Sequence, residues 1–146
     1  MSKTRILIHI VFSTRHREPS IPAENKRRLY AYLHGIVTKH RCTTLRINGM
    51  SDHVHLLIDL HPAVALSSLV KELKQSSSLW MKDQPDFAGF SGWNDGYYAA
   101  SIGAGDEEEC IGYIINQEHH HQSAATVDEA RWLAMEYKLE WDSRDW

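Results

Sequence analysis

The stretch GMSDHVHLLIDL, residues 49–60, places two histidines one residue apart at the start of an apolar run. Residues 49–52 have the composition of a tight turn, and the apolar run after them predicts a buried strand. Successive side chains of a strand point to opposite faces, so His53 and His55 share one face. The other face carries only apolar side chains: Val54, Leu56 and Ile58. The strand therefore predicts a sheet with one apolar face and a pair of imidazoles on the other, able to hold one cation or to receive one phosphate.

The remaining periodicities predict one α+β domain over residues 1–146. Strands are expected over residues 5–14, 42–50, 53–59 and about 97–102, and helices over residues 23–39, 65–82 and 106–122. The first strand, apolar on both faces, is expected to be central in the sheet, and Trp80 of the second helix is expected to face the core. The order β-α-β-β-α-β predicts a ferredoxin-like (RRM-like) antiparallel sheet with two helices on the apolar face. The additional C-terminal helix, residues 106–122, is then expected to cover the histidine face.

Charge divides along the chain, although the formal net charge is only -3. Residues 1–82 carry a net charge of +8 and residues 83–146 a net charge of -11. Basic clusters in the first part fit a surface that contacts phosphates, although for any one cluster a solvated surface is an equal explanation. The candidate DNA-binding residues lie on the loop after the first strand and on one face of the second helix: Arg15, Arg17, Lys71, Lys74, Gln75 and Ser78.

Two further observations limit the class of protein. The sequence contains no apolar stretch near the twenty residues that a membrane span needs, which predicts a cytoplasmic protein without a membrane partner. Cys42 and Cys110 form neither a disulfide framework nor a metal-binding pair motif, so both are expected to be reduced and buried.

Tyr113 and Gln117 are the candidate site residues of the third helix. Being four residues apart, they lie on one stripe and face the same neighbour. A phenol and a carboxamide beside two imidazoles supply a nucleophile and a third metal ligand. The alternatives are that Tyr113 is a core aromatic residue of an amphipathic helix, and that His120 or His121 replaces Gln117 as a ligand.

These motifs resemble the single-tyrosine HUH transposases of small bacterial insertion sequences, the IS200-like transposases. The resemblance rests on the motif His53-Val54-His55 and on YIINQ some sixty residues later. It extends to IHIVFSTRHR near the start and to WNDGYY before the tyrosine helix, and so covers about residues 4–122.

The resemblance implies a transposase that cleaves and rejoins single-stranded DNA through a 5'-phosphotyrosine intermediate. It implies that Tyr113 attacks the DNA and that His53, His55 and Gln117 hold a divalent cation, Mg²⁺ or Mn²⁺. It also implies hairpin-bearing element ends as the substrate, and a homodimer in which the tyrosine helix of one subunit can serve the histidines of the other.

The alternative to an active transposase is a catalytically silent nucleic-acid-binding or regulatory module of the same fold. Tyr97 and Tyr98 are rival nucleophiles, but they sit in an expected strand without a partner at ligand spacing, and we interpret them as packing or base-stacking residues. His9 is interpreted as a structural histidine. The acidic, tryptophan-rich segment of about residues 126–146 is expected to form a helix that lies beyond the resemblance.

Overall fold

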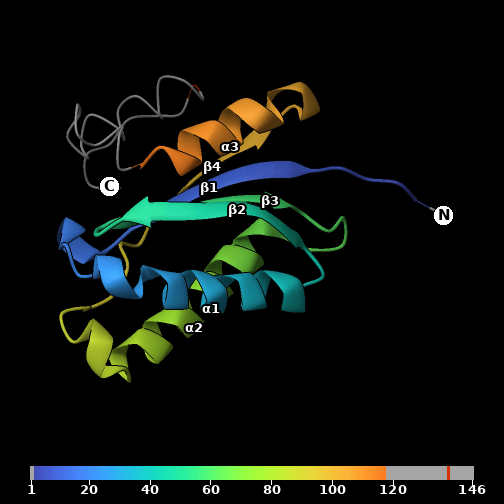
Figure 1. Ribbon diagram of the computed structural model, residues 1–146. Coiled ribbons are helices and arrows are strands. Elements are labelled where there is room, and N and C mark those ends of the chain that lie inside the picture. The colour runs from blue at the N-terminus through green and yellow to red at the C-terminus, as the bar shows by residue number, and fades with distance from the viewer. Residues whose placement is uncertain (1, 118–137, 139–146) are drawn as a thin grey trace.

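The computed structural model describes residues 2–117 and Lys138 (Figure 1). The helices and strands are β1 Leu7–Ser13, α1 Lys26–Lys39, β2 Thr43–Met50, β3 His53–Asp59, α2 Leu66–Lys82, β4 Tyr98–Ile102 and α3 Glu107–Ile115. The strands form a four-stranded antiparallel sheet in the order β2-β3-β1-β4. The α+β class and the central position of the first strand are therefore confirmed. Among the described residues, no helix combines the length and the apolar character needed to cross a membrane.

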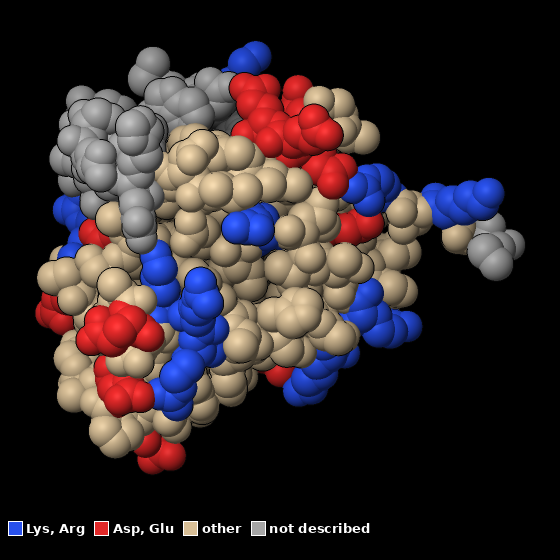
Figure 2. Space-filling view, in the orientation of Figure 1, with Lys and Arg blue, Asp and Glu red and all other residues tan. Residues whose placement is uncertain are grey.

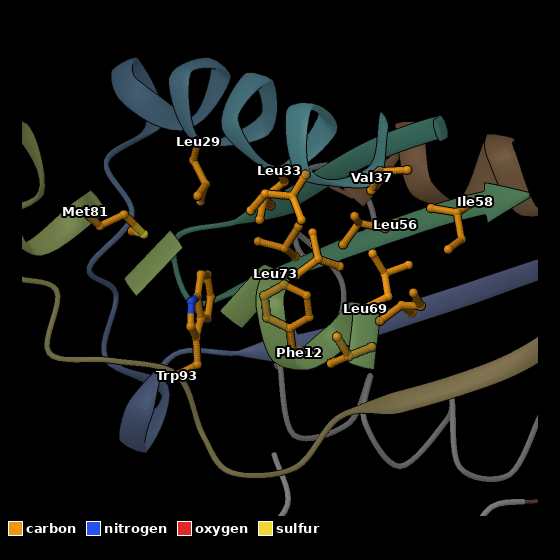
Figure 3. Close-up of a cluster of buried hydrophobic side chains, with 14 of the residues drawn as sticks. Phe12, Leu29, Leu33, Val37, Leu56, Ile58, Leu69, Leu73, Met81 and Trp93 are labelled. Carbon is orange, nitrogen blue, oxygen red and sulfur yellow. The ribbon is translucent and has the colours of Figure 1, made fainter. Parts of the chain in front are cut away.

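The sheet separates α1 and α2 on one side from α3 on the other (Figure 1). On the α1–α2 side, alternate residues of β1 and β3 enter the main hydrophobic core. The two helices add their buried faces to this core (Figure 3), with these residues among others: Leu29, Leu33, Val37, Leu69 and Leu73. Burial of these aliphatic side chains contributes the larger part of the hydrophobic stabilisation, at about 25 cal/mol per Å² of apolar surface.

A smaller apolar cluster lies on the α3 side of the sheet. Leu7 and Leu57 from the strands contact Cys110 and Ile114 from α3. Beside this cluster the same face carries three buried histidines: His9, His53 and His55. The predicted division of the histidine strand into an apolar face and a histidine face is therefore confirmed.

A two-residue turn, Ser51-Asp52, connects β2 to β3, so the turn is shorter than the predicted span of residues 49–52. Gly49 belongs to β2 and pairs with Val54. A Cβ atom at Gly49 would lie 2.2 Å from the backbone oxygen of His53, so no other residue fits without moving the strand. The hairpin thus depends on glycine at the point where β3 begins.

The helix boundaries and one core position differ from the prediction. Residues Ala23–Asn25 form a 3-10 turn, so α1 begins at Lys26 and not at Ala23 as predicted. Trp80, expected in the core, lies at its edge and stacks on Tyr32 at 4.7 Å between ring centroids. Ser77 and Met81 occupy the buried positions of α2 instead, because they lie on the stripe that continues from Leu73.

Acidic side chains gather over the amino-terminal end of α3, and basic side chains lie over the α1 side of the molecule (Figure 2). Carboxylates in the first turn of a helix interact favourably with its dipole. The predicted helix over residues 106–122 is observed as Glu107–Ile115, and Gln117 follows two residues later. His119, His120 and His121 lie outside the described residues, and so does the acidic segment 126–146 except for Lys138.

Candidate active site

His53 and His55 lie side by side on β3, and neither side chain is exposed to solvent. Their ring centroids are 5.1 Å apart. His53 Nδ1 lies 2.7 Å from Asp52 Oδ1, and His55 Nδ1 lies 2.9 Å from His9 Nε2. Each imidazole is therefore held through its Nδ1 atom by a neighbouring side chain, an arrangement common for histidines that bind metals through the other nitrogen.

Tyr113 and Gln117 meet the histidine pair from α3 and the residues just after it. The Tyr113 ring lies edge-on to His55, with the centroids 5.6 Å apart. Gln117 is fully buried, and its Oε1 lies 3.1 Å from His53 Nε2. Its Nε2 donates to the backbone oxygen of Tyr113 at 3.2 Å, which fixes the orientation of the amide. The four residues predicted as one site therefore lie together in space.

The contact between His53 and Gln117 tests whether a divalent cation fits. When His53 Nδ1 donates to Asp52, the Nε2 of a neutral ring carries a lone pair that faces the lone pairs of Gln117 Oε1. Such a contact is stabilised either by a proton on Nε2 or by a cation bound to both atoms. Adjacent ligands in an octahedral Mg²⁺ site at about 2.1 Å are about 3.0 Å apart, close to the distance between these two atoms. The spacing of these two atoms therefore fits a shared divalent cation.

The candidate donor set is two imidazoles and one amide oxygen. Within residues 2–117, no three histidine, cysteine, aspartate or glutamate side chains come together as a metal site. If His53, His55 and Gln117 bound one cation, the third ligand would be an amide oxygen rather than a carboxylate or a thiolate. Oxygen and imidazole donors can bind Mg²⁺ and Mn²⁺. The affinity of such a donor set does not by itself exclude softer metals.

The sequence analysis missed Asn48 and Asp52 as parts of this site. The Asn48 side chain donates to the backbone oxygens of Ile114 and Ile115, at 3.0 and 3.2 Å, and so ties the end of α3 to β2. Asn48 pairs with His55 across the hairpin. The signal was available, because a two-residue turn at 51–52 fixes this register and places Asn48 on the histidine face.

A cavity of about 570 Å³ lies beside α2. Five of the six predicted DNA-binding residues line it: Arg15, Lys71, Lys74, Gln75 and Ser78. Arg17 is not among the lining residues. Leu79 and Tyr97 also line the cavity and are 73% and 38% exposed. The cavity thus combines cationic side chains with an accessible aromatic ring.

Lys74 is the least available of these cations. Its Nζ donates to the backbone oxygens of Asn94, Asp95 and Gly96, at 2.5, 3.0 and 3.2 Å. Burial lowers the pKa of Lys74, and the nearby Asp95 carboxylate partly opposes this shift. Lys74 therefore holds the loop before β4 in place, and Arg15 and Lys71 are the exposed cations of the cavity.

The cavity is connected to the histidine pair through the end of β1. Asn94, which lines the cavity, donates its side-chain amide to Ser13 Oγ at 2.9 Å. Ser13 pairs with His53 across the sheet. His16 and Arg17, which follow β1, adopt left-handed φ angles of 56° and 54°. A strained turn thus follows the end of β1 that is linked to the cavity and to His53, and strained residues are often found near functional sites.

The chain matches a known family. The pattern of the family described as "Transposase IS200 like" matches residues 2–117. The transposases of insertion sequence element IS200 from Salmonella typhimurium and Salmonella typhi are 28% identical over 100 residues, which are 65% of this chain. The match spans 66% of the length of these curated relatives.

Two solved structures have similar folds. A transposase candidate from Deinococcus radiodurans R1 is 25% identical, with a TM-score of 0.60 over 80% of this chain and 93% of its own. A REP-associated tyrosine transposase bound to a REP hairpin is 15% identical, with a TM-score of 0.64 over 100% of this chain and 91% of its own. The chain belongs to the IS200-like transposase family.

Proposed function

We propose that this chain is a metal-dependent transposase that cleaves and rejoins single-stranded DNA, with Tyr113 as the nucleophile. The observation that carries the proposal is the meeting of Tyr113 and Gln117 with His53 and His55 on one face of the sheet. A structural core has no need of a phenol, an amide and two imidazoles packed together. In this proposal the sheet is ferredoxin-like in the order of its elements, and α3 is the helix that brings the nucleophile.

The reaction follows from the chemistry of the phenol. Tyr113 Oη attacks the scissile phosphorus, the bond from phosphorus to the 3' oxygen breaks, and the phenolic proton is replaced by a 5'-phosphotyrosine bond. The leaving 3' oxygen takes up a proton. Because the ester conserves the energy of the broken bond, a second 3' hydroxyl can attack it and release Tyr113. Cleavage and rejoining therefore need no nucleotide cofactor.

His53, His55 and Gln117 would hold the cation, Mg²⁺ or Mn²⁺. When bound, such an ion polarises the phosphate and offsets the charge that develops on the leaving oxygen. The contact of His53 with Asp52 keeps its Nδ1 proton engaged and directs Nε2 toward Gln117. Complete burial of these three side chains excludes bulk water from the site, which strengthens each electrostatic contact.

The proposed substrate is single-stranded DNA that carries a hairpin. In the cavity beside α2, Arg15 and Lys71 are placed to contact phosphates and Tyr97 to stack on a base. The contacts from Asn94 to Ser13, and the pairing of Ser13 with His53, connect the wall of this cavity to the strand end that carries the histidine pair. The neighbour of similar fold that is bound to a REP hairpin supports the choice of a hairpin substrate. Equal or tighter binding to a blunt duplex would contradict it.

A homodimer is also part of the proposal. The sheet leaves β2 and β4 as edge strands, and Ile115, next to the active site in the chain, is 45% exposed. In the structure α3 packs on the sheet of its own chain, through Cys110 and Ile114. A second subunit would bury the exposed apolar surface and could exchange α3. Light scattering at micromolar concentration is expected to give twice the mass of one chain, and a monomer would count against the dimer.

The test is the formation of covalent DNA–protein adducts. A labelled single strand with a hairpin is incubated with the protein and Mg²⁺ or Mn²⁺, and denaturing gels report the adduct. We expect adducts from the native protein, none from Tyr113→Phe and none in excess EDTA. Tyr97→Phe is the matched control and is expected to keep the adduct.

The controls also separate this proposal from its alternative. Tyr113→Phe removes one oxygen, so binding of the labelled strand should persist. DNA retention without any adduct from the native protein would indicate a silent binding module instead. Undiminished adducts from Tyr113→Phe would contradict the assignment of the nucleophile, and full activity in EDTA would contradict the metal.

A further inference from the structure

His9 is a third histidine on the face that holds His53 and His55. It lies in β1, pairs with Leu57 and is 1% exposed. Its Nε2 lies 2.9 Å from His55 Nδ1, and the two rings are stacked with centroids 5.1 Å apart and an interplanar angle of 29°. Its ring also lies edge-on to Tyr113, at 6.2 Å between centroids. His9 therefore contacts both the proposed ligand His55 and the proposed nucleophile.

The contact between His9 and His55 permits two arrangements of protons. In one, His55 Nδ1–H donates to His9 Nε2, and His55 Nε2 carries a lone pair. In the other, His9 Nε2–H donates to His55 Nδ1, and His55 Nε2 carries the proton. Only the first leaves His55 able to bind a cation through Nε2, because a neutral imidazole has a single lone pair on its ring nitrogens.

We propose that His9 is a positioning residue that accepts the Nδ1 proton of His55 and so fixes the ring in the ligand form. The inference rests on the proposed metal site, in which His55 is a ligand. His9 does for His55 what the Asp52 carboxylate does for His53. The stacked geometry also fixes the plane of the His55 ring, and the edge contact limits where the Tyr113 ring can lie.

The chemistry of the surroundings explains why an imidazole takes this position rather than a second carboxylate. His9 lies on the strand between Leu7 and Val11 and opposite Leu57, all three at most 2% exposed. Ionised carboxylates are costly in such an environment, whereas a neutral imidazole accepts a hydrogen bond without adding charge. Asp52, in contrast, lies in the turn at the end of the strand, where its side chain is 14% exposed.

The first experiment determines which ring nitrogen of His55 carries the proton. Long-range proton–nitrogen NMR spectra of the histidine-labelled, metal-free protein distinguish the two forms. We expect a single form of His55 with the proton on Nδ1. A proton on Nε2 would overturn the inference, and this result does not depend on any DNA chemistry.

The second experiment measures Mn²⁺ affinity without DNA, by calorimetry, in two variants of His9. His9→Leu fills the space but accepts no hydrogen bond, and we expect a loss of affinity of about 10-fold to 100-fold. His9→Gln can accept through its amide oxygen and should recover most of the affinity. His34→Leu, at an exposed position of α1, is the matched control and should change nothing.

The two experiments separate this inference from the proposed function. Native affinity in His9→Leu would overturn the role of His9 even if the protein forms DNA adducts. A protein that binds Mn²⁺ through a correctly oriented His55 but forms no adducts would contradict the transposase chemistry and leave the role of His9 intact. If His9→Leu does not fold, a loss of Mn²⁺ affinity of about 10-fold to 100-fold in a folded His9→Gln would overturn the inference, because a hydrogen-bond acceptor alone would then not suffice.

Discussion

The two faces of the sheet are both buried, yet they are built from different side chains. Toward α1 and α2, the central strands present only apolar residues: Ile8, Ile10, Phe12, Val54, Leu56 and Ile58. Toward α3, the same strands present His9, His53 and His55, and Gln117 closes over them with no exposed surface. Buried imidazoles and amides lower stability unless every polar atom has a partner, whereas buried aliphatic groups raise it.

The difference indicates that the two faces of the sheet have different roles. The α1–α2 face supplies the larger part of the hydrophobic stabilisation, which allows the α3 face to hold polar groups in a fixed arrangement. Mutations on the α1–α2 face should therefore change stability more than Mn²⁺ binding or adduct formation. Mutations on the α3 face should change Mn²⁺ binding and adduct formation more than stability.

Leu73→Ala should have the largest effect on stability. Leu73 is fully buried in the main core, and the lost contacts and the cavity should lower the free energy of unfolding by about 2–5 kcal/mol. Urea denaturation measures the change. Leu79→Ala, on the same helix at a position 73% exposed, is the control and should be nearly neutral. Similar losses in both variants would contradict the assignment of the core.

His53→Ala should destabilise less and abolish the chemistry. The loss of the contacts with Asp52 and Gln117 leaves polar groups without their partners, at a cost of about 1–3 kcal/mol. Mn²⁺ binding and adduct formation should both disappear, while Leu73→Ala should retain both at temperatures where it is folded. A variant that still binds Mn²⁺ with native affinity would break the contrast between the faces.

Asn48→Ala should loosen α3 without affecting α1 or α2. Its two hydrogen bonds to the end of α3 contribute about 1 kcal/mol each. Hydrogen exchange of the α3 amides should accelerate about 10-fold or more, and exchange in α1 and α2 should stay unchanged. Asn25→Ala is the control. It removes a side-chain hydrogen bond to the backbone oxygen of Asp86, on the α1 side of the sheet. If the α3 amides exchanged at the same rate in Asn48→Ala as in the native protein, Asn48 would not hold α3 in place.

Glu72→Gln should have the smallest effect. Hydrogen bonds from Lys39 and His40 lower the pKa of Glu72 below its usual value. The stability from this cluster is therefore present above the usual carboxyl pKa and is lost as the pH falls through the lowered value in the folded state. The native protein should exceed Glu72→Gln slightly in urea midpoint at pH 7, and the difference should vanish in acid. A difference that grows in acid would have the wrong sign.

The spacing of apolar residues and the residue types of the turns were enough to predict most of the fold. The alternation in β1 and β3 and the helical spacing of Leu69 and Leu73 report directly which side chains are buried. The exact start of α1 and the edge position of Trp80 were missed, because capping geometry and the competition of Met81 for the core depend on packing between helices.

The sequence was enough to predict which residues come together at the candidate site, but not the hydrogen bonds that hold them. Motif spacing brought His53, His55 and Gln117 together, while the contacts of Asp52, Asn48 and His9 needed the register of the hairpin and the strand order. Lys74 was predicted to contact DNA, and its three bonds to backbone oxygens could not be foreseen, since the loop at 94–96 has no regular structure to reason from.

The most direct measurement is the identity of the residue that carries DNA. Adducts formed by the native protein on a hairpin-bearing single strand with Mn²⁺ are digested with nuclease and protease, and mass spectrometry locates the remaining nucleotide. Tyr113 is predicted to carry it through a 5' phosphate. A nucleotide on Tyr97 or Tyr98, or an adduct that survives in Tyr113→Phe, would contradict the assignment of the α3 face as the site of chemistry.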